Sequence, residues 1–212
     1  MCSNYRPATR EQRLTYSLNR DFFDSQTRDT YPGMAAPVII LNEGTERICV
    51  AATFGMLPFW TKSRDFSKRT YNARHETVGE KPSFRHAWGR AQTCIVPARA
   101  IYEPSYESGK SEWWSIWPED EAPMSVAGLW EEKEWGDRLP LLSFTMLTVN
   151  AAEHPVMSRF HKPGNEKRSV VMLTDEQIGA WLTATEPGDM NDIITHAGTD
   201  RLETASGRLR PD

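Results

Sequence analysis

Most apolar residues of this chain fall in short segments that alternate with turn-forming residues, and few fall in long helical repeats. Runs rich in Val, Ile and aromatic residues are followed by Gly, Pro, Asn or Asp. Such runs are typical of strands, because β-branched and aromatic side chains suit a pleated, half-buried surface. The segments expected to form strands are 37–41, 47–54, 93–102 (broken by Pro97), 113–117, 124–130, 141–149 and 168–173. The sequence therefore predicts an α+β fold built mainly on antiparallel sheet.

A few helices are expected beside this sheet. Thr9 with Gln12 and Thr174 with Gln177 both form capping-box patterns, which mark helix starts. The expected helices cover residues 10–24, 82–88 and 175–182. A chain of 212 residues suits one domain, 1–212, whose polar tail from about residue 196 to residue 212 is expected to fray.

The composition narrows the class of protein. Charged residues make up 25% and hydrophobic residues 39% of the chain, as in ordinary soluble proteins, and no apolar run is long enough to span a membrane. No signal-peptide pattern begins the sequence, so a cytoplasmic protein is expected. A monomer is expected as well. Cys2, Cys49 and Cys94 are widely separated, which argues against disulfides and against a zinc site. No glycine-rich phosphate loop is present, and neither a metal nor a cofactor is expected.

Charge is segregated along the chain although the net charge is only −4. Residues 62–99 hold nine Lys/Arg against three Asp/Glu, a balance of +6, and residues 103–138 hold ten Asp/Glu against three Lys/Arg, a balance of −7. The basic stretch also contains aromatic residues, Trp60 standing just before it. Cations that follow phosphates, together with rings on which bases stack, favour a single-stranded nucleic-acid groove. The alternative is that the rings lie in the core and the charges form a solvated face.

The second residue of the chain offers unusual chemistry. If Met1 is removed, Cys2 carries a free α-amine and a thiol on adjacent carbons. The amine condenses with an aldehyde to an imine, and the thiol then closes a five-membered thiazolidine. The amine titrates near ~7.7–8.0 and the thiol near ~8.5, so both nucleophiles are accessible at neutral pH. The alternative is a frayed terminus with an idle thiol.

Three internal residues are candidates to assist such chemistry. Asn72 has an amide that could orient a nucleophile or a carbonyl. Glu103 ends an apolar run, where partial desolvation raises a carboxyl pKa and suits it to acid–base work. His161 is a natural proton shuttle near neutral pH. Each could equally be a solvated surface residue.

Several stretches taken together resemble the SOS-response-associated peptidase (SRAP) family. They are Met1-Cys2, Leu57–Trp60, residues 72–84 (NARHETVGEKPSF), residues 94–103 (CIVPARAIYE) and residues 150–161. The resemblance runs through about Leu182. It implies a compact α+β domain with a barrel-like, mainly antiparallel sheet and a positively charged groove.

The resemblance also implies a function in the DNA damage response. Family members bind single-stranded DNA and crosslink to abasic sites through the N-terminal cysteine, which is exposed by autoproteolytic removal of Met1. Carried over to this sequence, Cys2 is the nucleophile, Asn72 orients the terminus, Glu103 is the general acid/base, and His161 assists ring opening and imine formation. The positions that match DNA contacts are Trp60, Arg74, Lys81 and Asn150.

The sequence departs from the family pattern at several contacts. Ser3-Asn4 replaces the usual Gly-Arg after the cysteine, Pro104 replaces a tryptophan, and residues 161–168 lengthen a segment near His161. Two alternative functions therefore stay open. One is a non-covalent single-stranded DNA-binding module, and the other is a cysteine-type peptidase or amidohydrolase that uses Cys2.

Overall fold

The computed structural model describes residues 2–23, 28–43, 45–135, 138–195 and 201–209. Its strands are β1 (Tyr5–Pro7), β2 (Arg20–Asp21), β3 (Ala35–Leu41), β4 (Arg47–Phe54), β5 (Asn72–Arg74), β6 (Thr93–Ser105), β7 (Glu112–Pro118), β8 (Met124–Trp135), β9 (Arg138–Asn150), β10 (Arg168–Val170), β11 (Met172–Leu173) and β12 (Leu202–Ser206). The α-helices are α1 (Arg10–Arg13), α2 (Arg85–Gly89), α3 (Asp175–Thr183) and α4 (Pro187–Thr195), and the 3-10 helices are η1 (Leu14–Tyr16), η2 (Arg64–Arg69), η3 (His75–Thr77) and η4 (Met157–Arg159).

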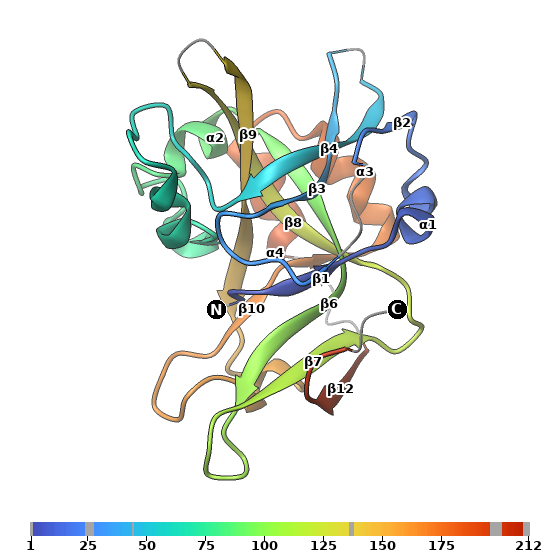
Figure 1. Ribbon diagram of the computed structural model, residues 1–212, viewed down its shortest axis with the longest axis vertical. Helices are drawn as coiled ribbons and strands as arrows, with labels where there is room; N and C mark the ends of the chain where they lie inside the picture. The colour runs from blue at the N-terminus through green and yellow to red at the C-terminus, as the bar shows by residue number, and fades with distance from the viewer. Residues whose placement is uncertain (1, 24–27, 44, 136–137, 196–200, 210–212) are drawn as a thin grey trace.

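The central strands close on themselves. β8, β9, β4, β3 and β6 are neighbours in that order, and β6 also pairs with β8, so these strands form a barrel. β6 continues beyond the barrel into an outer ribbon with β7 and β12, which extends downward in Figure 1. β1, which begins just after Cys2, lies antiparallel to β6 where the barrel passes into this ribbon. The sheet thus places the start of the chain beside residues 98–101 of β6, where its pairing with β8 ends.

The strand residues alternate between two apolar clusters, as a pleated backbone requires. Ile39 and Ile95 face the cluster that α3 and α4 cover, with Trp181 at its centre. Val38 and Val96, one position away, face the second cluster, which fills the barrel. The side chain of Cys2 belongs to this second cluster. The N-terminus is therefore built into the core of the fold.

The strand and fold predictions are confirmed with few changes. Every segment expected to form a strand does so, and the single α+β domain with a mainly antiparallel, barrel-like sheet is observed. The break expected at Pro97 is wrong, because β6 runs through it without interruption. Pro97 faces Ser125 near the point where β6 exchanges β8 for β1 and β7 as its partners. A residue without an N–H is tolerated where the ladder changes partner.

The helix expected at residues 10–24 is wrong for residues 17–23, and residue 24 lies outside the described residues. Thr9 and Gln12 form the predicted capping box, but α1 ends at Arg13 and only η1 follows. Arg13 is 1% exposed, and its guanidinium pairs with Asp21 at 2.8 Å and donates to the carbonyl of Phe23. A continuous helix would carry Asp21 away from this buried cation. The chain instead turns back, and β2 pairs with β4.

The expectation that the polar tail frays is wrong for residues 202–206. These residues form β12, which pairs along β7 from Leu202 to Ser206. β7 would otherwise be the open edge of the outer ribbon, with unpaired backbone groups that favour another strand. Residues 196–200 and 210–212 of the predicted tail lie outside the described residues.

Gly55 gives a direct test of the packing beneath the loop that follows β4. Its φ is +105°, and a Cβ there would lie 2.1 Å from the carbonyl oxygen of Ser67. Gly109 also has a positive φ of +81° but faces open space. We expect Gly55→Ala to lower the free energy of unfolding by about 3 kcal/mol and Gly109→Ala by only about 1 kcal/mol. Urea unfolding measures both changes. Equal losses of unfolding free energy in the two variants would contradict the close approach of the Ser67 carbonyl oxygen to residue 55.

Candidate active site

Glu103 lies near the end of β6, opposite Trp114 of β7. The strand places its carboxyl in the interior, where the residue is 2% exposed. Burial disfavours the charged form and raises the pKa of Glu103 from 4.5 to about 7. The carboxyl can therefore both hold and release a proton at neutral pH.

His161 approaches this carboxyl from the loop after η4. Its Nε2 lies 3.3 Å from Oε2 of Glu103, and its backbone N–H donates to the carbonyl of Pro104 at 2.9 Å. Its φ of +69° is left-handed, and the ammonium of Lys167 holds its carbonyl oxygen at 3.0 Å. A non-glycine residue in this conformation is strained, and such strain persists where the surroundings fix it. The loop thus holds the imidazole against Glu103.

The Glu103–His161 pair is not a salt bridge of two full charges. Burial, together with nearby positive charge that includes Lys167, lowers the pKa of His161 to about 4. The imidazole is therefore neutral near pH 7, while the carboxyl is about half protonated. A neutral base beside a carboxyl of near-neutral pKa can pass protons in either direction, which is what reversible carbonyl chemistry requires.

Cys2 lies beside this pair. It is 1% exposed, and its Sγ donates to the carbonyl of Asn4 at 3.4 Å. Burial raises the pKa of the thiol well above its usual range, and the negative charge of nearby Glu103 raises it further. Cys2 is therefore a protonated thiol in the resting protein. Met1, whose removal the family resemblance implies, lies outside the described residues.

Asn72 lies on a separate strand, and among the described residues its side chain makes no hydrogen bond to Cys2, Glu103 or His161. It begins β5, which runs parallel to β9 with Asn72 opposite Met146. Its Nδ2 donates to the carbonyl of Tyr71 at 2.9 Å, while its Oδ1 is buried with no hydrogen-bond partner among the described residues. An unsatisfied buried acceptor is costly in a folded protein. This oxygen is therefore well suited to accept a hydrogen bond from a group that enters the site.

Tyr71 adjoins Asn72 and was not among the predicted catalytic residues. Its ring packs edge-on against Phe54 at 5.9 Å in the barrel. Burial raises the pKa of the Tyr71 phenol, and the proximity of Cys2 and Glu103 raises it further. Tyr71 is therefore close to Cys2 and Glu103 and adjoins Asn72 in the chain. Its position directly before Asn72 was the only signal in the sequence.

The four residues expected to contact DNA lie at the surface. Trp60 is 43% exposed and contacts Phe66 edge-on at 5.1 Å, and Lys81 is exposed before α2. Asn150 is exposed at the end of β9, where its Oδ1 accepts from the N–H of Ala152. Arg74 is half exposed and pairs with Glu166 at 2.9 Å.

Arg74 belongs to an ion-pair network that the sequence did not reveal. Arg168 is buried at the start of β10 and binds both carboxylate oxygens of Glu76 at 2.8 Å. Arg168 also pairs with Glu166 at 2.8 Å, and Glu166 in turn reaches Arg74. The network ties the residues after β5 to the segment that follows His161.

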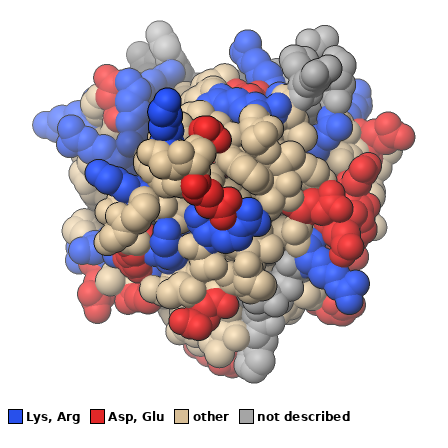
Figure 2. Space-filling view, turned by 90° about the horizontal axis from the view of Figure 1, so that it is seen from below, with Lys and Arg blue, Asp and Glu red and all other residues tan. Residues whose placement is uncertain are grey.

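The charge segregation of the sequence is only partly kept in space, because Glu131 of β8 bonds to His86 and the guanidinium of Arg64 lies over the ring of Trp135. In Figure 2, blue side chains predominate on the left, the side on which Figure 1 places η2 and α2, and a continuous red patch lies on the right. Phe59 and Trp60 are large hydrophobic residues exposed on the loop before η2. Cations and exposed rings thus share one side of the molecule.

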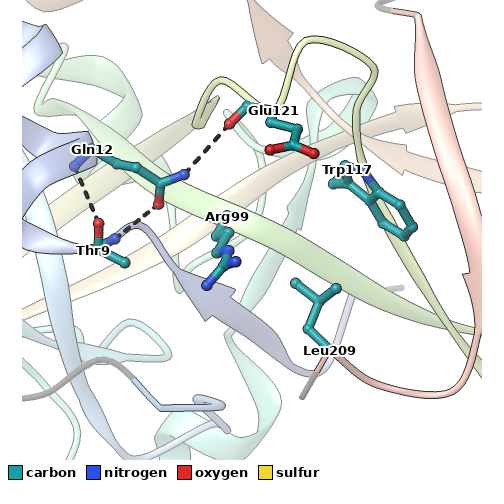
Figure 3. A pocket seen from close by; sticks show the side chains of 6 residues that line it. All are labelled: Thr9, Gln12, Arg99, Trp117, Glu121 and Leu209. Atoms are coloured by element: carbon teal, nitrogen blue, oxygen red, sulfur yellow. Dashed lines mark hydrogen bonds between the residues drawn. The ribbon is translucent and has the colours of Figure 1, made fainter. Parts of the chain in front are cut away.

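The described residues also show what the protein offers for a small-molecule pocket, a metal site or a membrane span. A cavity of about 410 Å³ lies away from the site residues, lined by Thr9, Gln12, Arg99, Trp117, Glu121 and Leu209 (Figure 3). Among the described residues, no group of three or more His, Cys, Asp or Glu side chains is placed to hold a metal ion. Within the same residues, no helix is both long and apolar enough to cross a membrane.

The structure thus defines a class of β-barrel proteins in which a buried cysteine near the N-terminus lies beside a carboxyl and an imidazole. The SOS response associated peptidase (SRAP) family matches residues 1–206. The chain belongs to this family.

Individual relatives agree with this assignment. The abasic site processing protein YoqW of Bacillus subtilis is 29% identical over 176 residues, which cover 77% of this chain and 71% of YoqW. The abasic site processing protein HMCES of Pongo abelii is 27% identical over 66% of this chain and 46% of its own length. A crystal structure of a protein from Bordetella bronchiseptica superposes with a TM-score of 0.85 at 34% identity, covering 98% of this chain and 100% of that one.

The raised pKa of Glu103 predicts a pH-dependent stability. The folded state binds this proton more tightly than the unfolded chain, so the stabilisation is complete below pH 4.5 and is lost as the pH rises through about 7. Glu103→Gln cannot ionise at this position. We expect its free energy of unfolding, minus that of the wild type, to rise by on the order of 3 kcal/mol as the pH rises from 4 to 8.

Urea unfolding across this pH range measures the difference. Glu132→Gln removes an exposed carboxylate from β8 and is the matched control. A Glu103→Gln difference that does not change with pH would show that the carboxyl is solvated.

Proposed function

We propose that this protein senses abasic sites in single-stranded DNA and crosslinks to them through Cys2. The observation that carries the proposal is the burial of Cys2 beside the Glu103–His161 pair. A frayed terminus would place the thiol in solvent. The printed names of the relatives, abasic site processing proteins, supply the substrate class.

The chemistry requires several proton transfers. The closed abasic sugar opens to an aldehyde when its ring oxygen gains a proton and its C1′ hydroxyl loses one. The α-amine of Cys2 then adds to the aldehyde, and loss of one water gives an imine. The thiol adds across the imine to close a thiazolidine, and its proton passes to the nitrogen. Atoms balance with one water released, and no redox partner is needed.

The site residues suit these steps. Glu103, with a pKa of about 7, can donate to the sugar oxygen and take up the proton again. His161 is neutral at this pH and can accept a proton from the sugar hydroxyl or the α-amine. The buried Oδ1 of Asn72 can accept from the α-amine and hold its lone pair toward the aldehyde. Positioning of this kind replaces a bimolecular encounter.

The reaction needs an unblocked α-amine on Cys2, so Met1 has to be removed first. A thiol beside a carboxyl and an imidazole is also the group set of a cysteine-type peptidase. We include autoproteolytic removal of Met1 by this same site in the proposal. Trp60, Lys81, Arg74 and Asn150 are proposed to guide the DNA strand toward it.

Cys2 variants test the covalent step. We expect wild-type protein to give a denaturation-resistant band with an abasic single-stranded oligonucleotide, and Cys2→Ala to give none. Prepared without Met1, the alanine variant keeps an α-amine on residue 2 and so forms an imine that only borohydride reduction traps. Cys49→Ala, which removes a buried thiol elsewhere in the core, is the control. A stable Cys2→Ala adduct formed without borohydride would refute the proposal.

The Arg74–Glu166 pair makes a separate prediction about DNA affinity. Glu166 pairs with the guanidinium of Arg74, which a phosphate would otherwise contact. Glu166→Gln should therefore tighten binding to intact single-stranded DNA about threefold. It should also steepen the slope of log K against the logarithm of the salt concentration by about 0.7. Fluorescence anisotropy at several salt concentrations measures both. Glu11→Gln, on α1, makes the same charge change at an exposed position and should leave the slope unchanged. Equal slopes for the two variants would exclude Arg74 from the DNA path.

A further inference from the structure

The last described residues of the chain run back across the outer ribbon. After β12, the backbone N–H of Gly207 donates to the carbonyl of Trp113 at 2.7 Å. The hydroxyl of Ser115 donates to the carbonyl of Gly207 at 2.7 Å. The chain is thus held against β7 for one residue beyond the strand, and it then enters a cluster of aromatic residues.

Arg208 is surrounded by three aromatic rings. Its guanidinium carbon lies 5.4 Å from the ring centre of Tyr31, 5.4 Å from that of Tyr102 and 5.1 Å from that of Trp113. The same guanidinium donates to the hydroxyl of Tyr31 and lies 3.8 Å from a carboxylate oxygen of Asp29. Cations over aromatic faces are attracted by the ring quadrupole, and several rings around one cation form a cage. We call these three rings the arginine cage.

The arginine cage is tied to the strand that follows Cys2. Asp29 accepts from Nε of Arg6 at 2.6 Å and from the hydroxyl of Tyr102 at 2.8 Å. Arg6, in the middle of β1, also donates to the carbonyl of Leu209 at 3.3 Å. The side chain of Leu209 then forms part of the wall of the cavity in Figure 3. The C-terminal segment therefore contacts both β1 and the cage that braces it.

A short path leads from the arginine cage to the nucleophile. The backbone N–H of Tyr102 donates to the carbonyl of Asn4 at 3.2 Å, and Sγ of Cys2 donates to that same carbonyl at 3.4 Å. Tyr102 also directly precedes Glu103. β1 is only three residues long and its register with β6 shifts after Arg6, so contacts outside this ladder, including the bridge from Tyr5 to Thr30, add to its hold on the terminus.

We propose that residues 207–209 are a clasp that positions the reactive terminus, with Arg208 in the arginine cage as its key residue. The clasp holds β1 against β6 and thereby fixes Cys2 relative to Glu103 and His161. Arg208 acts through this contact and is a positioning residue. The family match ends at residue 206, so the clasp lies beyond it. The catalytic part of this inference rests on the proposed function, whereas the clasp itself does not.

Native-state alkylation tests the clasp without any DNA. Iodoacetamide labelling followed by peptide mass mapping reports Cys2, Cys49 and Cys94 separately, and the two internal cysteines serve as controls within each sample. We expect Arg208→Ala to speed labelling of Cys2 about tenfold, since loss of the cage contacts favours local opening, and to leave the other two unchanged. Arg201→Ala, at an exposed arginine just before β12, should change none of them.

Rescue distinguishes a positioning role from a general loss of stability. Methylguanidinium chloride fits the cage that Arg208→Ala empties, so millimolar concentrations should restore slow labelling of Cys2 in that variant alone. Arg208→Lys should give an intermediate rate, because an ammonium keeps the cation but lacks the planar donor groups. If Arg208→Ala does not fold, Arg208→Lys and a chain ending at Ser206 replace it.

Single-turnover crosslinking then tests the consequence for the reaction. With abasic oligonucleotide, Arg208→Ala should lower the maximal rate about tenfold with little change in the half-saturating DNA concentration. Unchanged Cys2 labelling in Arg208→Ala would overturn the clasp. Faster labelling of Cys2 with an unchanged maximal crosslinking rate would overturn the positioning role of Arg208. Absence of crosslinking in the wild type would refute the proposed function, but it would not affect the labelling test of the clasp.

Discussion

The contact between Glu103 and His161 in the interior of the protein is the interaction on which the other features of the site depend. In water the carboxyl would be ionised and the imidazole partly protonated, and the two would form an ordinary ion pair. Burial shifts both pKa values toward the neutral forms, to about 7 for Glu103 and about 4 for His161. A pair with a neutral imidazole and a carboxyl that is about half protonated near pH 7 can exchange protons with a sugar or an amine in a low-dielectric site.

The fold creates this environment by using one long strand for two purposes. The first half of β6 belongs to the barrel, and its second half forms the outer ribbon with β7. Glu103 lies in the second half, where β1 covers one edge of the strand and the His161 loop covers the end. Chain termini are usually loose. In this protein the N-terminus is a structural element, because Cys2 and Tyr5 both contribute to the barrel core.

Sequence patterns predicted the parts of the structure that depend on local residues. Val38 and Ile39, or Cys94 and Ile95, identify strands because each apolar run carries its own β-propensity. Residue chemistry made Cys2, Asn72, Glu103 and His161 separate candidates, and the family resemblance grouped them into one site. The structure brings Cys2, Glu103 and His161 together, whereas the Asn72 side chain makes no hydrogen bond to any of these three.

The features that the sequence did not reveal depend on contacts between distant residues. Leu14, Leu18 and Phe22 have helical spacing, yet the buried ion pair of Arg13 with Asp21 turns the chain back. Residues 202–206 are polar and look loose, but the open edge of β7 pairs with them. The ion pair of Glu166 with Arg74 joins positions that no local pattern connects. Tertiary contacts outweigh local propensity in each case.

Intact mass spectrometry of the protein after reaction with an abasic single-stranded oligonucleotide tests the central claim most directly. The account predicts one adduct per chain, whose mass equals the protein without Met1 plus the oligonucleotide minus one water, and fragmentation that places the link on Cys2. An adduct on chains that retain Met1, or a link on a lysine, would contradict it.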